Sequence, residues 1–317
     1  MIATMAILPK NVSILIPAFG RPEMTFNAVQ CAIQTNAGEI IISDDASGMD
    51  LFNLLKKFSG DKRLRIFHQK NNLGLWPHHL FLVNQASGNW IKFLQTDDSF
   101  SPEDLDNFCQ WAEEDVALIS MEPKYLYSDG RVEEVGRIKE PIVFEAKKFS
   151  GAMMMKGNVA GRPSYCLYQK ELMKLDVSFW ENEISADLVQ NWYLGTRGKV
   201  ILLPAGRVYC GVHGGQEGKK QTYHLIFSRL TNSLRVVGDN AEDEESKMFV
   251  SVYGLVEYAG LFAAFFLAMV RKGEFHLELL LKTWIKSFFL FIKCFSFPAY
   301  WKPCFYYFKF KFMDKSL

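Results

Sequence analysis

The sequence lacks paired cysteines, a hydrophobic leader and a strong net charge. Its six cysteines are scattered without a Cys-x-x-Cys pair, which argues against a structural zinc site and favours a reduced, cytosolic chain. The opening stretch MIATMAILPKNVS has only a short apolar piece, so we expect no secretory signal. A formal net charge of +1 gives no strong field, and we therefore expect no nucleic-acid partner.

The sequence does have the composition of a folded protein. Of its 317 residues, 49% are hydrophobic and 22% are charged, which is enough apolar surface for a core. By length the chain is one large domain, or one domain with an appendage. Its charge is uneven, because the segment from residue 271 to the end carries a balance of +6 and the first 270 residues carry −5.

Apolar runs of strand length alternate with helical patterns through the first 120 residues. The helix expected at 101–114 opens with Ser101 as N-cap and Pro102 in its first turn. Continuous apolar strands that alternate with helices indicate a parallel sheet covered on both faces. The expected strands are 12–19, 39–45, 64–69, 90–94 and 116–120, and the other expected helices are 21–34, 51–58 and 77–86.

Three of these strands finish in residues that can bind a ligand, namely 17–19, Asp44-Asp45 and Asp97-Asp98. Adjacent carboxylates repel one another, so either water dilutes the repulsion at a turn or a cation or ligand cancels it. In open α/β sheets, ligands bind beyond the carboxyl ends of the strands. We therefore expect a binding site at this edge.

Beyond residue 120 the alternation weakens. YSDGRVEE predicts a hairpin with an Asp-Gly turn, and GNVAGRPSY predicts a glycine-rich loop. DLVQNWYLGTRGKVILLP returns to helix, turn and strand, and the α/β pattern ends in the glycine-rich VYCGVHGGQEGKK. We therefore expect an α/β domain over 1–220 and a helical extension over 221–317.

The motifs, in their order and spacing, resemble those of the family 2 glycosyltransferases of the GT-A fold. They are VSILIPAFGRPE, IIISDDAS, NNLG, WIKFLQTDD, GRPS, ADLVQNW and VHGG, and they cover about residues 11–216. The resemblance implies a GT-A nucleotide-diphospho-sugar transferase, with a mostly parallel sheet flanked by helices. It also implies an inverting hexosyltransferase that uses a nucleotide-sugar donor and Mn²⁺ or Mg²⁺, and we expect the donor to be a UDP-sugar.

The resemblance assigns the segment QTDD to the donor and its metal. Gln95-Thr96-Asp97 matches the family's Asp-x-Asp motif, so Asp97 becomes the metal ligand and Asp98 an adjacent ligand or a residue that contacts one. Gln95 replaces an Asp that contacts the ribose, and an amide can also hydrogen-bond a hydroxyl. His213, in VHGG, matches a histidine that reaches the diphosphate or the metal. Hard cations prefer carboxylate oxygens and stabilise a departing diphosphate.

Other matches concern the nucleotide. Asp45 matches the residue that accepts a hydrogen bond from uracil, whereas Asp44 could cap the turn. Pro17 and Phe19 match the wall against which the nucleotide packs, and both could also serve strand-end packing.

Two further segments lie near the expected donor site. Where the family has an Arg after NNLG, this chain has His78-His79, so a contact from Arg to the diphosphate is absent or replaced by a His. Adjacent histidines are more often surface residues than ligands. The loop with Gly161, Pro163 and Ser164 matches one that lines the sugar pocket.

Asp187 matches the position of the family's general base. An inverting transfer needs a carboxylate near the acceptor hydroxyl, on the face opposite the leaving group. The alternative is a structural Asp in the first turn of a helix that follows Ser185. Glu181 and Glu183 are close enough in sequence to take the catalytic role instead.

The C-terminal extension is rich in aromatic and basic residues. The apolar segment 251–270 is long enough to span a bilayer, but Glu257 interrupts it. In the next helical segment, Lys282, Lys286 and Lys293 fall on one narrow stripe. The apolar residues Leu280, Leu281, Trp284, Phe288 and Phe291 lie around the other side. Such a helix suits a membrane interface, and the alternative is a packed helical subdomain or an oligomer interface.

The resemblance implies an inverting, metal-dependent glycosyltransferase, and with the C-terminal extension we expect it to be peripheral on the cytoplasmic face of the inner membrane. Its acceptor would be a glycan or lipid-linked glycan of a bacterial surface polysaccharide. Two alternatives are a non-catalytic nucleotide-sugar-binding or scaffold protein of the same fold, and a sugar nucleotidyltransferase. The last would need a Gly-x-Gly-Thr-Arg loop after the first strand, which IPAFGRPE lacks.

Overall fold

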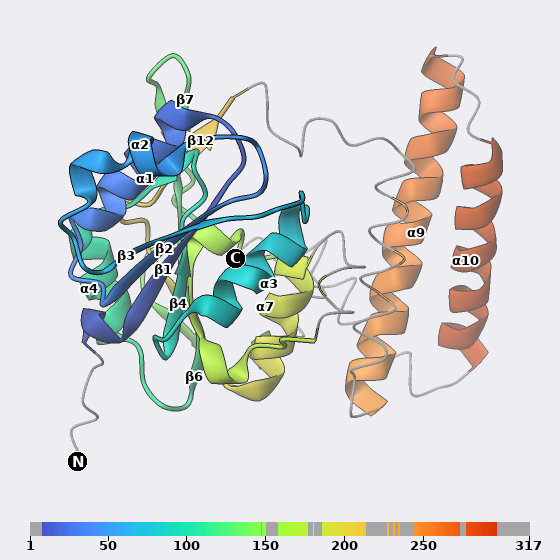
Figure 1. The fold of residues 1–317 in the computed structure, drawn as a ribbon. Coiled ribbons are helices and arrows are strands. Elements are labelled where there is room, and N and C mark those ends of the chain that lie inside the picture. Colours follow the sequence, from blue (N-terminus) through green and yellow to red (C-terminus); the bar gives the residue numbers. More distant parts are fainter. Residues whose placement is uncertain are drawn as a thin grey trace, which may run out of the picture. The chain divides into compact units, whose positions relative to one another are not determined.

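Figure 1 shows the computed structural model, whose chain divides into two compact units. The first unit comprises residues 1–149, 160–181 and 186–216, and the second comprises 150–159, 182–185 and 217–317. The structure describes residues 8–146, 148–149, 158–176, 180, 186–213, 227, 231, 234, 244–272 and 277–296.

The first unit is built on an eight-stranded mixed sheet in the order β3-β2-β1-β4-β10-β6-β11-β9. Neighbours β3, β2, β1 and β4 are parallel, as are β6 and β11, whereas β10 and β9 run antiparallel to their neighbours. The strands are β1 (Val12–Ala18), β2 (Glu39–Asp44), β3 (Leu64–His68), β4 (Trp90–Phe93), β6 (Val116–Met121), β9 (Ile142–Phe144), β10 (Cys166–Gln169) and β11 (Lys199–Leu203). The expected α/β architecture with a mostly parallel sheet is confirmed.

Helices cover both faces of this sheet, as two neighbouring residues of β4 show. Lys92 lies under the rings of Phe100 and Phe108, on the side of α1 (Pro22–Ile33) and α4 (Pro102–Gln110). Phe93 contacts His79 on the opposite side, where α3 (Leu75–Gln85) and α7 (Ala186–Arg197) pack (Figure 1). Because successive side chains of a strand point to opposite faces, β4 is buried throughout and its sequence has no polar alternation.

Local signals in the sequence account for several element ends. Ser101 caps α4 in a reciprocal capping box with Asp104, as its position predicted. The expected helix at 51–58 is shorter, with α2 at Leu51–Leu54 followed by a 3-10 turn at Lys56–Phe58. The YSDGRVEE segment forms the predicted antiparallel hairpin of β7 (Lys124–Tyr127) and β8 (Val132–Glu134).

A second, four-stranded sheet in the order β5-β12-β7-β8 lies where the main strands end. Its strand β5 (Asp98–Ser99) follows QTD directly and pairs with β12 (Tyr209–Val212), which precedes His213. This pairing brings two segments together that are more than 100 residues apart in the sequence.

The described part of the second unit is largely α9 (Glu244–Lys272) and α10 (Leu277–Ser296). The two helices pack through a small core of Phe265, Leu279 and Leu280. Within the described residues, neither helix combines the length and the hydropathy that crossing a bilayer requires.

Candidate active site

The two carboxylates that follow β2 each hold a neighbouring loop. Asp44 accepts hydrogen bonds from the backbone N–H of Ser47 at 2.9 Å and from its hydroxyl at 2.5 Å, so Asp44 caps the turn as expected. Asp45 accepts from the backbone N–H groups of Leu73 at 2.8 Å and Gly74 at 3.0 Å. A carboxylate can accept further hydrogen bonds, so the assignment of Asp45 to uracil stays a prediction.

The proposed nucleotide wall has one buried and one exposed member. Pro17 is buried within β1, whereas Phe19, just beyond the strand end, is 60% exposed. The Phe19 ring therefore has a face available for a flat ligand.

Asp97 and His213 face each other at the strand-end edge. Asp97 Oδ2 and His213 Nε2 are 3.1 Å apart, and both side chains are 18% exposed. Around Mg²⁺, ligand atoms at about 2.0–2.1 Å on neighbouring octahedral corners are roughly 3 Å apart, so the two atoms could hold one divalent cation. One oxygen and one nitrogen ligand suit Mn²⁺ better than Mg²⁺.

These two residues would need further ligands from a bound molecule. Within the described ranges, no group of three or more His, Cys, Asp or Glu side chains is arranged to hold a metal. A nucleoside diphosphate could supply the missing oxygens. Arg21 lies beside the pair, with Nη1 3.5 Å from His213 Nε2, and its guanidinium suits the same diphosphate. Sequence reasoning missed Arg21, because only the fold brings the start of α1 to His213.

Asp98 has a different environment from Asp97. It is buried, and its Oδ1 accepts a hydrogen bond from the backbone N–H of Gly211 at 3.1 Å. Burial, and then the charge of Asp97, raise the pKa of the Asp98 carboxyl to about 6. Asp98 therefore ties β5 to β12 and sets the separation of Asp97 and His213.

Gly211 has no room for a side chain, since a Cβ there would overlap the carbonyl oxygen of Asp97. We expect Gly211→Ala to push β12 away from Asp97, to lower the free energy of unfolding by about 1–3 kcal/mol, and to weaken Mn²⁺-dependent nucleotide binding. Gly60→Ala is the matched control, because nothing lies within 4 Å of a Cβ at Gly60. Thermal unfolding of both variants with UDP and Mn²⁺ checks this, and equal ligand-induced shifts would contradict it.

The two adjacent histidines are buried, which corrects the expectation of surface residues. His78 is 3% exposed and His79 is fully buried. His79 lies in the wall of a pocket that Pro163 and Trp180 also line. Burial lowers the pKa of His79 to about 3, so its ring is neutral.

His79 holds Gln95 in a defined orientation. His79 Nδ1 lies 2.6 Å from the carbonyl oxygen of Leu75, so this nitrogen carries the proton and donates. The other nitrogen must then accept, and Gln95 Nε2 donates to it at 2.7 Å. The amide oxygen of Gln95 is thereby fixed as the group that can accept a hydrogen bond from a ribose hydroxyl.

The neutral state of His79 makes stability depend on pH. Unfolded His titrates near 6.5 and folded His79 near 3, so the unfolded chain binds the extra proton between these values. The free energy of unfolding should therefore fall by about 2 kcal/mol from pH 7 to pH 5 through this residue. In His79→Gln this decrease of about 2 kcal/mol in the free energy of unfolding should be absent, to within about 1 kcal/mol. In His68→Gln, a change at an exposed histidine, the decrease should remain. Denaturant titrations at both pH values measure this, and the same fall in all three proteins would contradict it.

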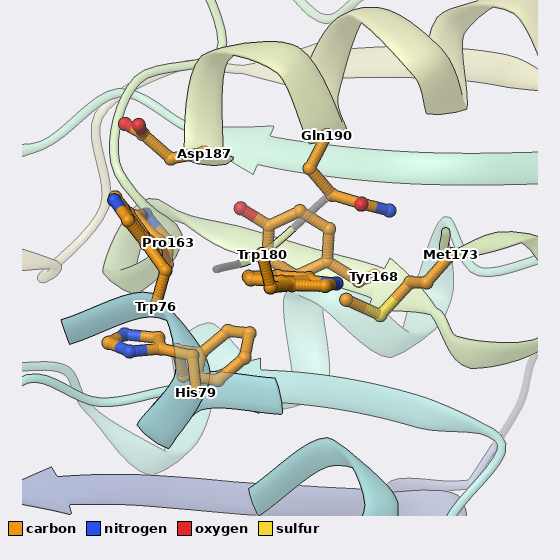
Figure 2. Close-up of a pocket in the computed structure, with 9 residues that line it drawn as sticks. Trp76, His79, Pro163, Tyr168, Met173, Trp180, Asp187 and Gln190 are labelled. Carbon is orange, nitrogen blue, oxygen red and sulfur yellow. The ribbon is translucent and has the colours of Figure 1, made fainter. Parts of the chain in front are cut away.

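Asp187 lies in the first turn of α7 and lines a pocket with eight other residues, shown in Figure 2. The rings of Trp76 and Trp180 form part of its wall, with centroids 6.3 Å apart. The remaining lining residues are His79, Phe93, Pro163, Tyr168, Met173 and Gln190.

Burial raises the pKa of the Tyr168 phenol, and the nearby charge of Asp187 adds to this rise. The rival carboxylates Glu181 and Glu183 lie outside the described residues.

The GRPS loop connects this pocket to the strand-end edge. Pro163 lines the pocket, and the Ser164 hydroxyl accepts a hydrogen bond from the backbone N–H of Gln95 at 3.1 Å. Asn191, one turn after Asp187, donates from Nδ2 to the carbonyl oxygen of Gly161 at 3.0 Å. The loop thus contacts both the helix of Asp187 and the QTDD segment.

The mixed sheet with carboxylates at its strand ends, and an acidic residue on a helix beside a pocket, defines a nucleotide-diphospho-sugar transferase fold of the GT-A type. The model of the family described as Glycosyl transferase family 2 matches residues 13–171, and the chain belongs to this family.

Relatives and solved structures agree with this family. A protein named uncharacterized glycosyltransferase from Rickettsia bellii (strain RML369-C) is 30% identical over 148 residues, which are 46% of this chain and 20% of the relative. One of the same name from Rickettsia felis is 34% identical over 112 residues, or 35% and 18% of the two chains. The chain thus spans about a fifth of the length of these curated relatives.

The fold itself is similar to that of solved structures. TarS 1-349 of S. aureus in complex with UDP-GlcNAc has a TM-score of 0.64 and 15% identity, over 86% of this chain and 79% of that one. The complex of the same protein with UDP gives a TM-score of 0.59 and 16% identity, over 89% and 80%. At this identity the likeness establishes the fold alone.

Proposed function

We propose that the protein is an inverting glycosyltransferase that moves a sugar from a nucleotide-sugar donor to a hydroxyl of a glycan or lipid-linked glycan. The observation that carries the proposal is the facing pair of Asp97 and His213 at the strand-end edge. The GRPS loop connects this pair's segment to the pocket of Asp187. A UDP-linked donor is the first choice, because the neighbouring fold has been solved with UDP and UDP-GlcNAc.

In this mechanism each residue has one task. Asp97 and His213 would hold the divalent cation, Mn²⁺ or Mg²⁺, which when bound stabilises negative charge on the diphosphate. Arg21 binds the diphosphate, and Gln95, oriented by His79, accepts a hydrogen bond from the ribose. Asp187 takes the proton from the acceptor hydroxyl as this oxygen attacks the anomeric carbon. The bond from this carbon to the diphosphate oxygen breaks, and the nucleoside diphosphate leaves with the electron pair.

Thermal unfolding tests the donor class. The midpoint is measured with UDP, GDP, dTDP and CMP, each with and without Mn²⁺. A nucleotide at about 100 times its dissociation constant should stabilise the fold by about 2.7 kcal/mol. A shift with UDP that requires the metal supports the proposal, and no shift with any nucleotide contradicts it.

A non-catalytic nucleotide-sugar-binding protein is the second candidate. The observation that favours it is the neutral pair of Gln95 and His79, which stands where the family carries a charged Asp and Arg. Such a protein would bind UDP yet show neither sugar transfer nor donor hydrolysis. Release of UDP from a UDP-sugar, measured by a coupled assay, separates the two candidates.

The second unit supports a peripheral membrane association on the cytoplasmic face of the inner membrane. Helix α10 packs on α9 through the side that carries Leu279, Leu280 and Thr283. Its exposed side is apolar, and the ion pair between Lys282 and Glu278 marks the charged stripe. An exposed apolar face beside a basic stripe suits a membrane interface. The exposed apolar residues are Leu277, Leu281, Trp284, Ile285, Phe288, Phe289, Phe291 and Ile292.

We expect the triple change Trp284→Ser, Phe288→Ser and Phe291→Ser to release the protein from membranes, as should deletion of 273–317. Each of these aromatic side chains is about half exposed, so the exchange removes lipid contacts without opening a core. Phe52→Ser, at a 63% exposed position in the first unit, is the control. Flotation with anionic vesicles measures binding. Retention of the triple variant and the deletion on the vesicles would contradict the membrane role.

A further inference from the structure

Strand β4 carries a buried lysine, Lys92, that the proposed mechanism does not use. Its side chain is fully buried, and none of the ion pairs among the described residues includes it. Burial lowers the pKa of its ammonium to about 8, so the group remains charged at neutral pH. A buried charge that forms no ion pair is costly, so stability alone does not explain a lysine at this position.

Backbone carbonyl groups and aromatic rings hold this ammonium in place. Its nitrogen donates to the carbonyl oxygen of Ser164 and, at 3.2 Å, to that of Phe93. The ring centroids of Phe100 and Phe108 lie 4.8 and 5.5 Å from it, and the faces of such rings attract a cation. Phe93 belongs to β4 itself, whereas Ser164 belongs to the GRPS loop. The ammonium therefore joins β4 to this loop.

The other end of the GRPS loop (161–164) is attached to the helix that carries Asp187. Asn191 Nδ2, on α7, donates to the carbonyl oxygen of Gly161 at 3.0 Å. Gly161 has a φ of +78°, and a Cβ there would overlap the ring of Tyr165, so the backbone packs tightly at this point. The loop is thus a short, closely packed link between β4 and α7.

We propose that Lys92 is a positioning residue for sugar transfer, because its ammonium fixes the GRPS loop and thereby the start of α7, so that Asp187 faces the bound donor at a reactive distance. The inference rests on the proposed function, in which Asp187 is the base. Lys92 acts through the loop and touches neither donor nor acceptor. A displacement of about 1 Å between reacting groups can reduce a rate about 100-fold, so an anchor of this kind matters for catalysis.

The proposed donor site has attachments that lie outside the loop. The N–H of Leu94 donates to the backbone of β1 at 2.9 Å, and Gln95 donates to His79 at 2.7 Å. The carboxylate of Asp98 accepts from the N–H of Gly211 at 3.1 Å. These three contacts hold the QTDD segment on β1, α3 and β12. Loss of the buried ammonium should therefore lower the rate of transfer and leave nucleotide binding nearly unchanged.

Lys92→Met tests this, because methionine has a similar shape but neither a charge nor a donor. We expect kcat for transfer to fall by about 10- to 100-fold, while the Kd of UDP with Mn²⁺, measured by calorimetry, changes by less than about threefold. The Tm should stay within about 4 °C of the wild type, since an apolar residue in place of a buried charge is often neutral.

Lys170→Met is the matched control. Lys170 Nζ also donates to a backbone carbonyl, that of Ala86 at 2.5 Å, but Lys170 follows β10 (Cys166–Gln169), whereas Ser164 precedes it. This variant should keep the kcat of the wild type. An unchanged kcat in Lys92→Met, or a Kd of UDP that weakens in step with kcat, overturns the proposal.

Hydrogen exchange tests the anchor without any activity measurement. In Lys92→Met the backbone amides of 158–165 should exchange about tenfold faster than in the wild type, a factor that one lost hydrogen bond can produce. The amides of 12–18 should keep their rate, and Lys170→Met should leave both segments unchanged. Unchanged exchange of 158–165 in Lys92→Met overturns the proposal. If the wild type transfers no sugar, the proposed function fails instead, and the exchange comparison still tests the anchor.

A purely structural role of Lys92 predicts a different pattern. Exchange would then become faster throughout the first unit, and the Tm would fall by more than about 4 °C. Lys92→Gln is the second variant, because it keeps a polar group that is too short to reach the loop. Loss of the folded state in both variants would assign Lys92 to the core alone and overturn the proposal as well.

Discussion

Asp97→Asn should abolish the metal-dependent binding of UDP and lower kcat/KM by about 1,000-fold or more. An amide oxygen is neutral, so the cation would keep only His213 as a full-strength protein ligand of the facing pair. Stabilisation of the departing diphosphate by a cation amounts to several kcal/mol, and about 1.4 kcal/mol corresponds to a factor of ten. The measurements are Mn²⁺-dependent melting shifts with UDP and initial rates of UDP release.

The control for this exchange is Asp106→Asn, at an exposed position on α4. A double-mutant cycle adds a sharper test, because residues that hold the same ion are not additive. His213→Ala should cost much less in the Asp97→Asn background than in the wild type. Undiminished transferase activity of Asp97→Asn, or strict additivity of the two changes, would contradict the metal assignment.

The sheet and its edge could be predicted because buried parallel strands have an unmistakable sequence pattern. VSILIPA and EIIISD are apolar runs without a polar face, and in the structure they are buried along their whole length. Their carboxyl ends meet at one edge by geometry alone, so Asp44, Asp45 and Asp97 could be assigned to that edge before the fold was known.

Other parts depended on contacts that the sequence does not encode locally. Strand β10 lies antiparallel between β4 and β6. Its residues Cys166–Gln169 follow a glycine-rich loop, and four residues are too short a run to predict a strand from the sequence. The pocket draws Trp76, Tyr168 and Trp180 from three separate segments, and no spacing rule connects them. Only tertiary packing brings such residues together.

The histidine pair shows why one expectation was wrong. Adjacent polar residues suggest an exposed helix face, but both histidines lie on the buried part of α3, together with Leu80, Leu82 and Val83. Polar groups that are buried in this way need internal partners. The partners of His79 are the carbonyl oxygen of Leu75 and the side-chain amide of Gln95. Gln95 and His79 both differ from the family's motif, and the two residues form one uncharged hydrogen-bonded pair.

Asp187→Asn should lower kcat by about 100- to 10,000-fold while the UDP-dependent melting shift stays unchanged. A general base contributes a factor of this size, and an amide cannot accept the proton of the acceptor hydroxyl. Asp187 lies in the pocket wall, whereas the proposed nucleotide and metal ligands lie at the strand-end edge, so donor binding should not depend on its charge. Rates of transfer at saturating donor, measured across pH, check this.

The competing role for Asp187 is electrostatic support of the first turn of α7. In that case Asp187→Asn would lower the free energy of unfolding by about 0.3–1 kcal/mol and change kcat little, because a charge at a helix N-terminus acts on the folded state. If Asp187 is the catalytic base, Asp187→Asn should instead lower kcat strongly and change the free energy of unfolding little. The acidic limb of the pH–rate profile should also disappear in this variant. Glu181→Gln and Glu183→Gln are the matched controls. If either of them, and not Asp187→Asn, removes the acidic limb, the base lies in that preceding segment and Asp187 supports the helix.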